Sequence, residues 1–431
     1  MKIWKKTAYE NTPLQVLVEK FTVGDDYLLD QALVPYDVQA SIAHAEGLYD
    51  IGILNETELM HLSSQLKQIK ALWEQDKFTI TVEEEDCHTA IENHLIQIIG
   101  VTGKKIHTGR SRNDQVLVAM RLWEKYEWNE IILLNKKLVQ KFITFAQTYE
   151  FMPMPGFTHT QIAMPSSVGM WAGSLAEMLI MNGETLKSYA HIIDKCPLGS
   201  AAGFGTHFNL PRQKTAQKLG FDDCLILSLT SQNTRGKIEA DLVSHLSSLS
   251  GTLAHFANDL VWYTSTQFQY FSVNESLTTG SSIMPQKKNL DPAELLRAKH
   301  AEILGHAFML KNLTNGLTSG YHRDLQLSKA PTMKAFATIK TMLEIAGCLI
   351  DNLSPIEANL RAAFVPNIFA ADAANEMVKN GIPFRDAYLE VGNNLGDLTL
   401  VDIDENLKSK THLGSTGNLG LELLQQQLNQ L

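Results

Sequence analysis

The chain has 431 residues, of which 44% are hydrophobic and 19% are charged, and its formal net charge is -10. This composition is that of a globular protein and excludes a disordered or fibrous chain. The negative net charge disfavours general nucleic-acid binding, which needs a basic surface to neutralise phosphates. An anionic ligand would therefore need a local basic pocket.

The cysteines and the N-terminus indicate the compartment. The chain has four cysteines, at Cys87, Cys196, Cys224 and Cys348, with no CxxC spacing, so we expect neither a zinc site nor a disulfide framework. The N-terminus is basic but lacks a following apolar segment, and no apolar run approaches about eighteen residues. We therefore expect a cytoplasmic protein without a membrane span.

Helical periodicity recurs along the chain and strand signals are few, which predicts an all-α fold. Shorter helices are expected up to residue 108, long helices from 109 to 355, and shorter elements again after that. The predicted domains are therefore an N-terminal helical domain (1–108), a central long-helix bundle (109–355) and a small C-terminal helical domain (356–431).

Two apolar seams predict the longest helices. One runs from Val168 to Tyr189. The other repeats at alternating spacings of four and three residues, through Leu242, Leu246, Leu249, Leu253, Phe256, Leu260 and Tyr263. Such seams fit the interior of a helical bundle, and part of them could instead be shared between subunits.

The first of three polar clusters is basic. The segment GKKIHTGRSRNDQV, residues 103–116, contains Arg110, Arg112, Asn113 and Asp114 just before a helical pattern. Two arginines with an amide and a carboxylate can grip carboxylates and amino-acid head groups in a bidentate manner. The alternative is a solvated turn between domains.

The second cluster, PMPGFTHTQIAMPSS at residues 153–167, is predicted to be a proline-bounded loop ahead of a long helix. It offers Thr158 and His159, and a histidine there can shuttle protons near neutral pH. The alternative is a histidine with a purely structural role.

The third cluster is TTGSSIMPQKKNLDPAELLR, residues 278–297. Asp291, Pro292 and Glu294 are predicted at the N-cap, N1 and N3 positions of a helix whose positive dipole end faces the preceding lysines. This arrangement suits a substrate whose negative charge grows when a proton beside a carboxylate is removed. A mobile surface loop is the alternative.

Together these clusters resemble the sequence blocks of a known family. GSSIMPQKKN, residues 280–289, is similar to the signature of the fumarase/aspartase superfamily. HTGRSRNDQV (107–116) and MPGFTHTQIAMP (154–165) resemble the argininosuccinate lyase versions of two further blocks. Further similarities at residues 196–206 and 381–388 extend the resemblance over nearly the whole chain.

The resemblance implies roles for particular residues. Ser281 would be the base, Lys287 and Asn289 would hold a carboxylate, and His159 would donate a proton while paired with Glu294. Further matches, at the mouth of the site, are Asp86 and His88. Positions that would contact the substrate are Arg112, Asn113, Thr158, Tyr321, Gln326 and Lys329.

The resemblance also implies an architecture and an activity. The fold would be three mostly helical domains whose central helices form a twenty-helix core in a homotetramer, with active sites shared between subunits and neither metal nor organic cofactor. The reaction would be the reversible elimination of argininosuccinate, a small-molecule substrate, to arginine and fumarate in arginine biosynthesis. The alternatives are a lyase acting on another N-succinyl or aspartate-derived adduct, such as adenylosuccinate, and a weakly active crystallin-like relative.

Three stretches depart from the family pattern. Thr22 and Gly24 stand where the family usually has asparagine and serine. Where the family commonly has S-x-R-D, this chain has Thr234, Arg235, Gly236 and Lys237, and residues 322–324 read HRD in place of NKD. These differences leave the elimination residues in place, while the exact substrate and the rate stay open.

Overall fold

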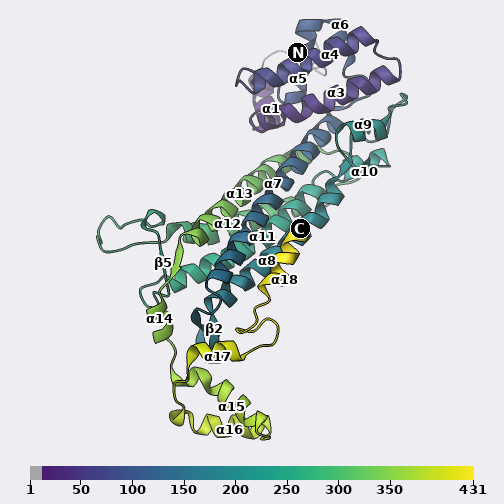
Figure 1. The fold of residues 1–431 in the computed structure, drawn as a ribbon. Coiled ribbons are helices and arrows are strands. Elements are labelled where there is room, and N and C mark those ends of the chain that lie inside the picture. The colour runs from purple at the N-terminus through teal and green to yellow at the C-terminus, as the bar shows by residue number, and fades with distance from the viewer. Residues whose placement is uncertain (1–11) are drawn as a thin grey trace. The chain divides into compact units, whose positions relative to one another are not determined.

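The computed structural model describes residues 12–431, which are predominantly α-helical (Figure 1). The predicted all-α class is therefore confirmed. The few strands form three separate two-stranded sheets: β1 (Pro153–Thr158) with β2 (Gln161–Ser167), β3 (Lys195–Cys196) with β4 (Asp223–Cys224), and β5 (Phe271–Val273) with β6 (Leu353–Pro355).

Five long helices account for the central part of the sequence: α7 (Arg112–Thr148), α8 (Val168–Ile193), α11 (Lys237–Tyr263), α12 (Asp291–Leu313) and α13 (Lys329–Asp351). Shorter helices precede them: α1 (Pro13–Val23), α2 (Asp26–Leu29), α3 (Val34–Asp50), α4 (Glu56–Trp73), α5 (Cys87–Ile99) and α6 (Val101–Lys105). Others lie between or after them: α9 (Arg212–Lys218), α10 (Ser228–Asn233), α14 (Glu357–Ala362), α15 (Ala370–Lys379), α16 (Phe384–Asn393), α17 (Ile403–Ser409) and α18 (Leu421–Gln430). Short 3-10 helices are η1 (Asp30–Leu33), η2 (Glu275–Leu277), η3 (Arg323–Ser328), η4 (Pro366–Phe369) and η5 (Leu395–Asp397).

The chain forms two compact units, each built from three separated segments. Unit 1 contains residues 12–130, Ser188–Ser244 and Gly305–Phe336, and unit 2 contains Ile131–Lys187, His245–Leu304 and Ala337–Leu431. Each long helix contributes residues to both units. The predicted domain boundaries at residues 108 and 355 stay a prediction.

In unit 1, helices α3, α4, α5 and α6 pack together as one group (Figure 1). Helix α4 buries Leu62, Leu66 and Ile69, which recur at spacings of four and three residues and so form one face. Its start is fixed by a capping box: Asn55 accepts the Glu58 N–H at 2.9 Å, and the Glu58 carboxylate accepts the Asn55 N–H at 3.1 Å.

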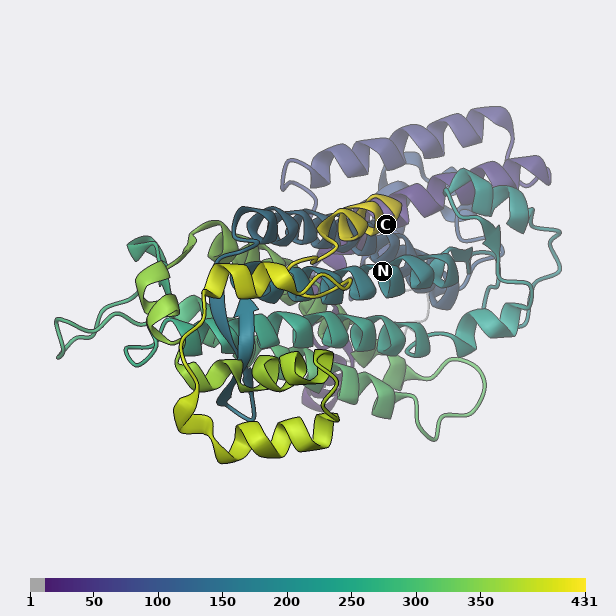
Figure 2. The ribbon, with the colours of Figure 1, turned by 60° about the horizontal axis from the view of Figure 1, so that its bottom comes forward.

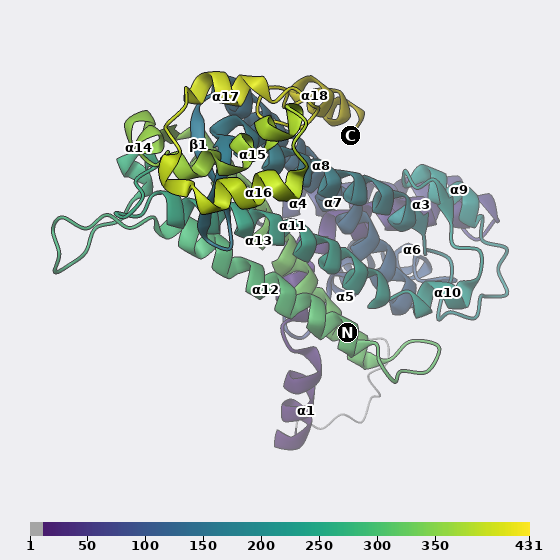
Figure 3. The same ribbon diagram turned by 90° about the horizontal axis from the view of Figure 1, so that it is seen from below.

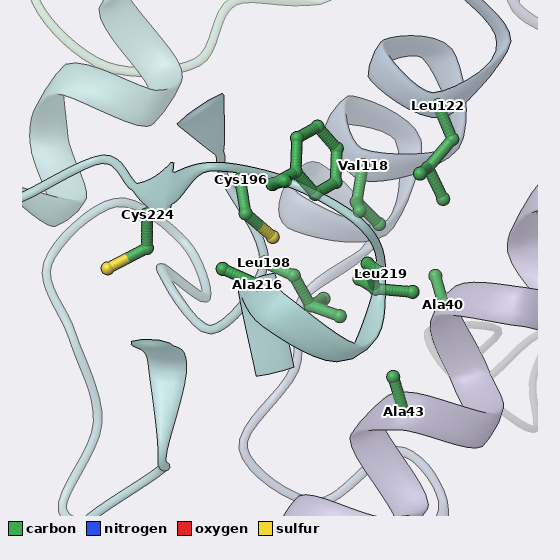
Figure 4. Packing of buried hydrophobic residues seen from close by; sticks show 10 residues of the cluster. Ala40, Ala43, Val118, Leu122, Cys196, Leu198, Ala216, Leu219 and Cys224 are labelled. Carbon is green, nitrogen blue, oxygen red and sulfur yellow. The ribbon is translucent and has the colours of Figure 1, made fainter. Parts of the chain in front are cut away.

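A second apolar cluster in unit 1 joins segments that are far apart in sequence (Figure 4). Ala40 and Ala43 of α3 meet Val118 and Leu122 of α7 and the segment around β3, α9 and β4. The small side chains on α3 allow these elements to approach closely. This packing fixes the first turns of α7, where Arg112 and Asn113 lie.

In unit 2, the predicted loop at residues 153–167 is wrong, because the segment is a β-hairpin. Thr158 pairs with Gln161, and the intervening His159 and Thr160 have φ angles of 52° and 59°, as a two-residue type I′ turn requires. Prolines are tolerated because a two-stranded ribbon consists of edge strands. The hairpin packs against α17, as Figure 2 shows, and α15 packs against α16 (Figure 3).

The predicted seam on α11 is buried along its whole length, from Leu242 to Tyr263. The seam on α8 is buried in part, since Trp171 and Met178 keep some exposure. Within unit 2, Phe256 of α11 contacts the ring of Phe142 of α7, with centroids 5.0 Å apart. Over residues 12–431, no helix is both long enough and apolar enough to cross a membrane.

The packing of α4 gives a stability prediction. Replacing Leu66 by Ala removes a fully buried side chain, so we expect the free energy of unfolding of unit 1 to fall by about 2–5 kcal/mol. Chemical denaturation followed by circular dichroism would measure this loss. The exposed neighbour Lys67→Ala is the matched control and should change the midpoint little. Equal midpoints for the two variants would contradict the assigned face of α4.

Candidate functional site

Unit 1 contains a cavity of about 390 Å3 that is lined mostly by charged and polar residues. Five of the six predicted substrate-binding residues line it: Arg112, Asn113, Tyr321, Gln326 and Lys329. The sixth, Thr158, belongs to the hairpin of unit 2. Sequence reasoning had not assigned several other lining residues to the site, namely Val23, Asp26, Glu85, Val116, Arg235 and Arg323.

Arg112 stands at the first turn of α7 and its guanidinium is held on three sides. Its Nε lies 2.9 Å from Asp86, its Nη1 lies 3.2 Å from Glu85, and its Nη2 donates to the Thr89 hydroxyl at 2.6 Å. Asp86 is itself the N-cap of α5 and accepts the Thr89 N–H. The charge of Arg112 is therefore paired, and its orientation at the cavity wall is fixed.

Arg110 and Asp114 were predicted to grip a ligand together with Arg112, and the structure contradicts this for both. Arg110 is buried and donates to Ser41 at 2.8 Å. The Asp114 carboxylate accepts N–H groups of Ser111, Gly199 and Ala201, which ties the start of α7 to the segment after β3. Burial raises the pKa of Asp114 to about 6. Both side chains face inward because their partners lie on other segments of unit 1.

Lys329 is 1% exposed at the cavity wall, and its ammonium is paired with two carboxylates. Its Nζ lies 2.6 Å from Asp30 and 3.3 Å from Asp26. Burial is the largest single influence and would lower the pKa of Lys329, but the charges of Asp30 and Asp26 and the hydrogen bond to Asp30 together outweigh it and raise that pKa. Lys329 is therefore a fixed cation whose charge is largely neutralised within unit 1.

Gln326 connects the cavity to the end of α1. Its Nε2 donates to the backbone carbonyls of Thr22 and Val23 at 3.0 and 3.1 Å. The Thr22 hydroxyl bonds back within α1, and Gly24 leaves the helix with a φ of 54°. Thr22 departs from the family pattern, and it is its backbone carbonyl, not its side chain, that bonds to Gln326 in the cavity lining.

Behind the cavity, His88 belongs to a buried chain of polar groups. Its Nδ1 lies 2.7 Å from the Asp37 carboxylate, which also accepts the Ser41 hydroxyl at 3.1 Å. Burial is the largest single influence and lowers the pKa of His88, but the charge and hydrogen bond of Asp37, together with the neighbouring carboxylates, outweigh burial and raise that pKa. The resemblance implied that His88 lines the mouth of the site; it is instead buried beside a separate cavity of about 50 Å3.

Asp30, Cys87 and His88 are the one group in residues 12–431 with metal-ligand geometry, their donor atoms lying within 4.8 Å of one another. The ammonium of Lys329 already pairs with Asp30, and His88 pairs with Asp37. A second cation would therefore meet positive charge at this position. Asp30 and His88 therefore serve as partners in ion pairs rather than as metal ligands.

Three of the predicted catalytic residues of the third cluster, Ser281, Lys287 and Asn289, lie on an exposed arm between β5 and α12 in unit 2 (Figure 1). Backbone bonds between Thr279 and Asn289 close the arm at its base. At the arm's turn, the Ser281 hydroxyl oxygen accepts the N–H groups of Ile283 and Met284 at 3.3 and 3.1 Å. Lys287 is solvent-exposed beside this turn.

The predicted cap of α12 is wrong by one residue. The Glu294 N–H bonds to the Leu290 carbonyl, so Leu290 and not Asp291 stands at the N-cap. Asp291 instead accepts the Thr279 hydroxyl at 2.6 Å and so fastens the arm to the helix. The helix still begins at the arm, as predicted.

His159 occupies the turn of the hairpin and Glu294 is exposed on the first turn of α12. Among the described residues, no hydrogen bond or ion pair joins them. Within one chain, the cavity residues of unit 1 come together, whereas the predicted histidine–glutamate pair does not form.

The His88–Asp37 pair predicts a pH dependence of stability. The raised pKa of His88 gives stabilisation that is complete below its ordinary value of 6.5 and is lost as the pH rises through the folded-state pKa. The pKa of Asp37 is lowered, since His88 and other partners outweigh burial, so its stabilisation exists above 3.8 and is lost in acid. The pair therefore contributes most between these two values.

We expect His88→Gln to lower the free energy of unfolding by about 3 kcal/mol near pH 6, the scale of breaking a buried ion pair. The loss should shrink at about pH 9 because wild-type His88 is then less protonated. Urea denaturation at both pH values measures this, with the exposed His61→Gln as the control. A loss independent of pH would exclude a charged His88.

Comparison with known proteins identifies the family. A family model described as a lyase matches residues 2–305. The argininosuccinate lyase of Thermotoga neapolitana is 40% identical over 397 residues, covering 92% of this chain and 98% of that protein. That of Sorangium cellulosum is 38% identical over 429 residues, covering 100% of this chain and 99% of that protein.

The solved structure of an EDDS lyase in complex with formate shares the fold, with a TM-score of 0.81 and 21% identity over 96% of this chain and 90% of that chain. The chain therefore belongs to the argininosuccinate lyase family.

Proposed function

We propose that this protein is an argininosuccinate lyase, which converts L-argininosuccinate reversibly to L-arginine and fumarate in arginine biosynthesis. The observation that carries the proposal is the match to relatives of that name over nearly the full length of both chains. The polar cavity of unit 1, with its paired and oriented cations, supports a charged small-molecule substrate.

In the proposed reaction, a base removes a proton from the succinyl carbon next to a carboxylate. The carbon–nitrogen bond breaks, its electron pair leaves with the guanidino nitrogen, and the carbon–hydrogen electrons form the double bond of fumarate. A proton returns to the leaving nitrogen. Negative charge grows on the carboxylate in between, so fixed positive groups lower the barrier.

Ser281 is proposed as the base. Two backbone N–H groups already point at its oxygen, and such donors favour the alkoxide over the hydroxyl. Lys287 and Asn289, on the same arm, would hold the carboxylate on which charge develops. His159 would supply the proton to the leaving nitrogen, with Glu294 as its partner.

We further propose a homotetramer whose active sites combine residues from several subunits. Exposed apolar side chains on the long helices support association: Phe308 of α12 is 71% exposed, and Leu295, Leu304 and Met181 are also exposed. Pairing of His159 with Glu294 between subunits would explain why each is exposed in a single chain. The proposed location is the cytoplasm.

For substrate binding we propose Arg112, Asn113, Tyr321, Gln326 and Lys329 in the cavity, together with Thr158 from the hairpin. Arg112 and Lys329 are already neutralised by carboxylates, so they would mainly orient hydrogen bonds. The departures at Thr22 and Gly24 leave a related N-succinyl adduct, such as adenylosuccinate, as the second candidate substrate. A crystallin-like role without turnover is the third alternative.

The activity test is release of fumarate, followed by its ultraviolet absorbance. Purified protein should release fumarate from argininosuccinate and not from adenylosuccinate offered separately. Release from adenylosuccinate alone would replace the proposed substrate. No release from either compound would favour the non-catalytic alternative.

Replacing Ser281 by Ala should reduce kcat at least about a hundred-fold, the usual minimum contribution of an acid-base group. The matched control is Ser282→Ala, the adjacent hydroxyl on the same exposed arm, which should keep near-normal turnover. Gel filtration would check that the assembly persists. If Ser282→Ala were the inactive variant, the base would have to be reassigned.

Mixing Ser281→Ala subunits with His159→Asn subunits tests the shared site in the same assay. Hybrid tetramers should regain part of the activity, because some sites then receive both intact residues. Hybrids that form but stay inactive would count against sites built from several chains.

A further inference from the structure

Arg235 is the buried cation of the cavity that has no carboxylate partner among residues 12–431. Four cations line the cavity: Arg112, Arg235, Arg323 and Lys329. Arg112 and Lys329 are ion-paired, and Arg323 is exposed and donates to the Thr22 carbonyl. Arg235 is only 5% exposed, and among residues 12–431 it has no ion pair within 4.0 Å and no side-chain hydrogen bond.

A buried guanidinium without a carboxylate is costly unless a ligand supplies the missing charge. Asp26 is near enough for its pKa to be affected by Arg235, but the contact of that carboxylate is with Lys329. The contact that Arg235 does make is with the ring of Tyr321, whose centroid lies 5.1 Å from its Cζ. Such a contact uses the face of the guanidinium and leaves the N–H donors in the guanidinium plane available to a ligand.

The backbone holds Arg235 in position. Gly236 has a φ of 79°, and a Cβ there would lie 2.7 Å from Thr314 and 2.9 Å from Leu325. The Gly236 N–H donates to Glu239 at 2.7 Å, and the Arg235 N–H donates to the Gln232 carbonyl at 3.2 Å. Glycine suits this positive φ and this close approach. Gly236 belongs to the stretch that departs from the family pattern, and its conformation positions the backbone from which the Arg235 side chain extends.

Arg235 also lines a second cavity, of about 150 Å3, in unit 1. Gln232, Asn233, Thr318 and Ser319 contribute polar groups to it. The Gln232 Oε1 atom is buried and has no hydrogen-bond partner among the described residues. Arg235 and Gln232 thus line the same cavity, and a guanidinium beside an amide suits a group carrying both a carboxylate and an ammonium.

We propose that Arg235 binds the α-carboxylate of the arginine end of the substrate and thereby sets specificity for an amino-acid head group. The inference rests on the proposed function. Within one chain none of the residues proposed for proton transfer lines the cavity, and the arginine end of the substrate is assigned to it.

The test compares L-arginine with agmatine, which has the same guanidinium and amine but no carboxylate. Calorimetric titration of the assembled wild-type enzyme should show arginine binding about ten- to a hundred-fold more tightly, the loss expected for one charge-assisted contact. This comparison needs no mutation. Equal affinities for the two ligands would overturn the proposal.

Arg235→Gln should remove most of this preference by weakening arginine and leaving agmatine unchanged. Arg235→Lys keeps the positive charge but loses the two parallel N–H donors of the guanidinium, so it should retain part of the preference for arginine. The matched control Lys237→Gln loses the same charge two residues away, on an exposed side chain paired with Asp241, and should keep the full preference. Circular dichroism and gel filtration would check folding and assembly.

Other outcomes overturn the assignment in distinguishable ways. Equal weakening of both ligands by Arg235→Gln would make Arg235 structural. In the synthetic direction, a raised KM for fumarate with an unchanged KM for arginine would move the contact to the succinyl end. Failure of the proposed function itself would appear separately, as no fumarate release by the wild-type enzyme.

Discussion

The ion pair between Lys329 and Asp30 is the constraint on which the cavity depends. It joins the start of α13 to the 3-10 helix after α2, nearly three hundred positions apart in the chain, at an Nζ to Oδ1 distance of 2.6 Å. A buried ammonium and a buried carboxylate are each strongly destabilising alone, so the two segments stay together or both charges are left unpaired. Gln326, three residues earlier, then reaches the carbonyls at the end of α1.

On the opposite wall of the cavity, a cation is again held by carboxylates from another segment of the chain. Arg112 is held by Glu85 and Asp86, and Asp86 also caps α5, so one carboxylate fixes both a helix start and a cavity cation. Asp114 ties the first turn of α7 to the segment after β3 through backbone N–H groups. The cations of the lining differ in function because of their partners: Arg112 and Lys329 maintain the shape, whereas Arg235 keeps its charge for a ligand.

Local patterns in the sequence were enough to predict the long helices and the polar clusters. Alternating spacings of four and three residues identify the buried face of α11 because the pattern is a property of that helix alone. The orientation of Arg110 and Asp114 could not be predicted in this way. Their partners, Ser41 and Gly199, lie in other segments, and nothing near residues 110–114 indicates them.

The hairpin at residues 153–167 shows a second reason why part of the structure could not be predicted from the sequence. Its prolines suggested a loop, since proline disfavours the interior of a sheet, but a two-stranded ribbon has no interior strand. Its turn places His159 and Thr160 at positive φ, where Asn-Gly would be the relaxed choice. The backbone conformation is therefore determined by the strands, and the identity of the turn residues is not explained by it.

That mismatch bears on function. Holding two side chains other than glycine in the left-handed region costs of order 1–3 kcal/mol for each. A histidine kept there at this cost, exposed and without a hydrogen-bond partner for its ring in the described chain, contributes nothing visible to the stability of the hairpin. The proton transfer to the leaving nitrogen that we propose for His159 would give this position a chemical reason.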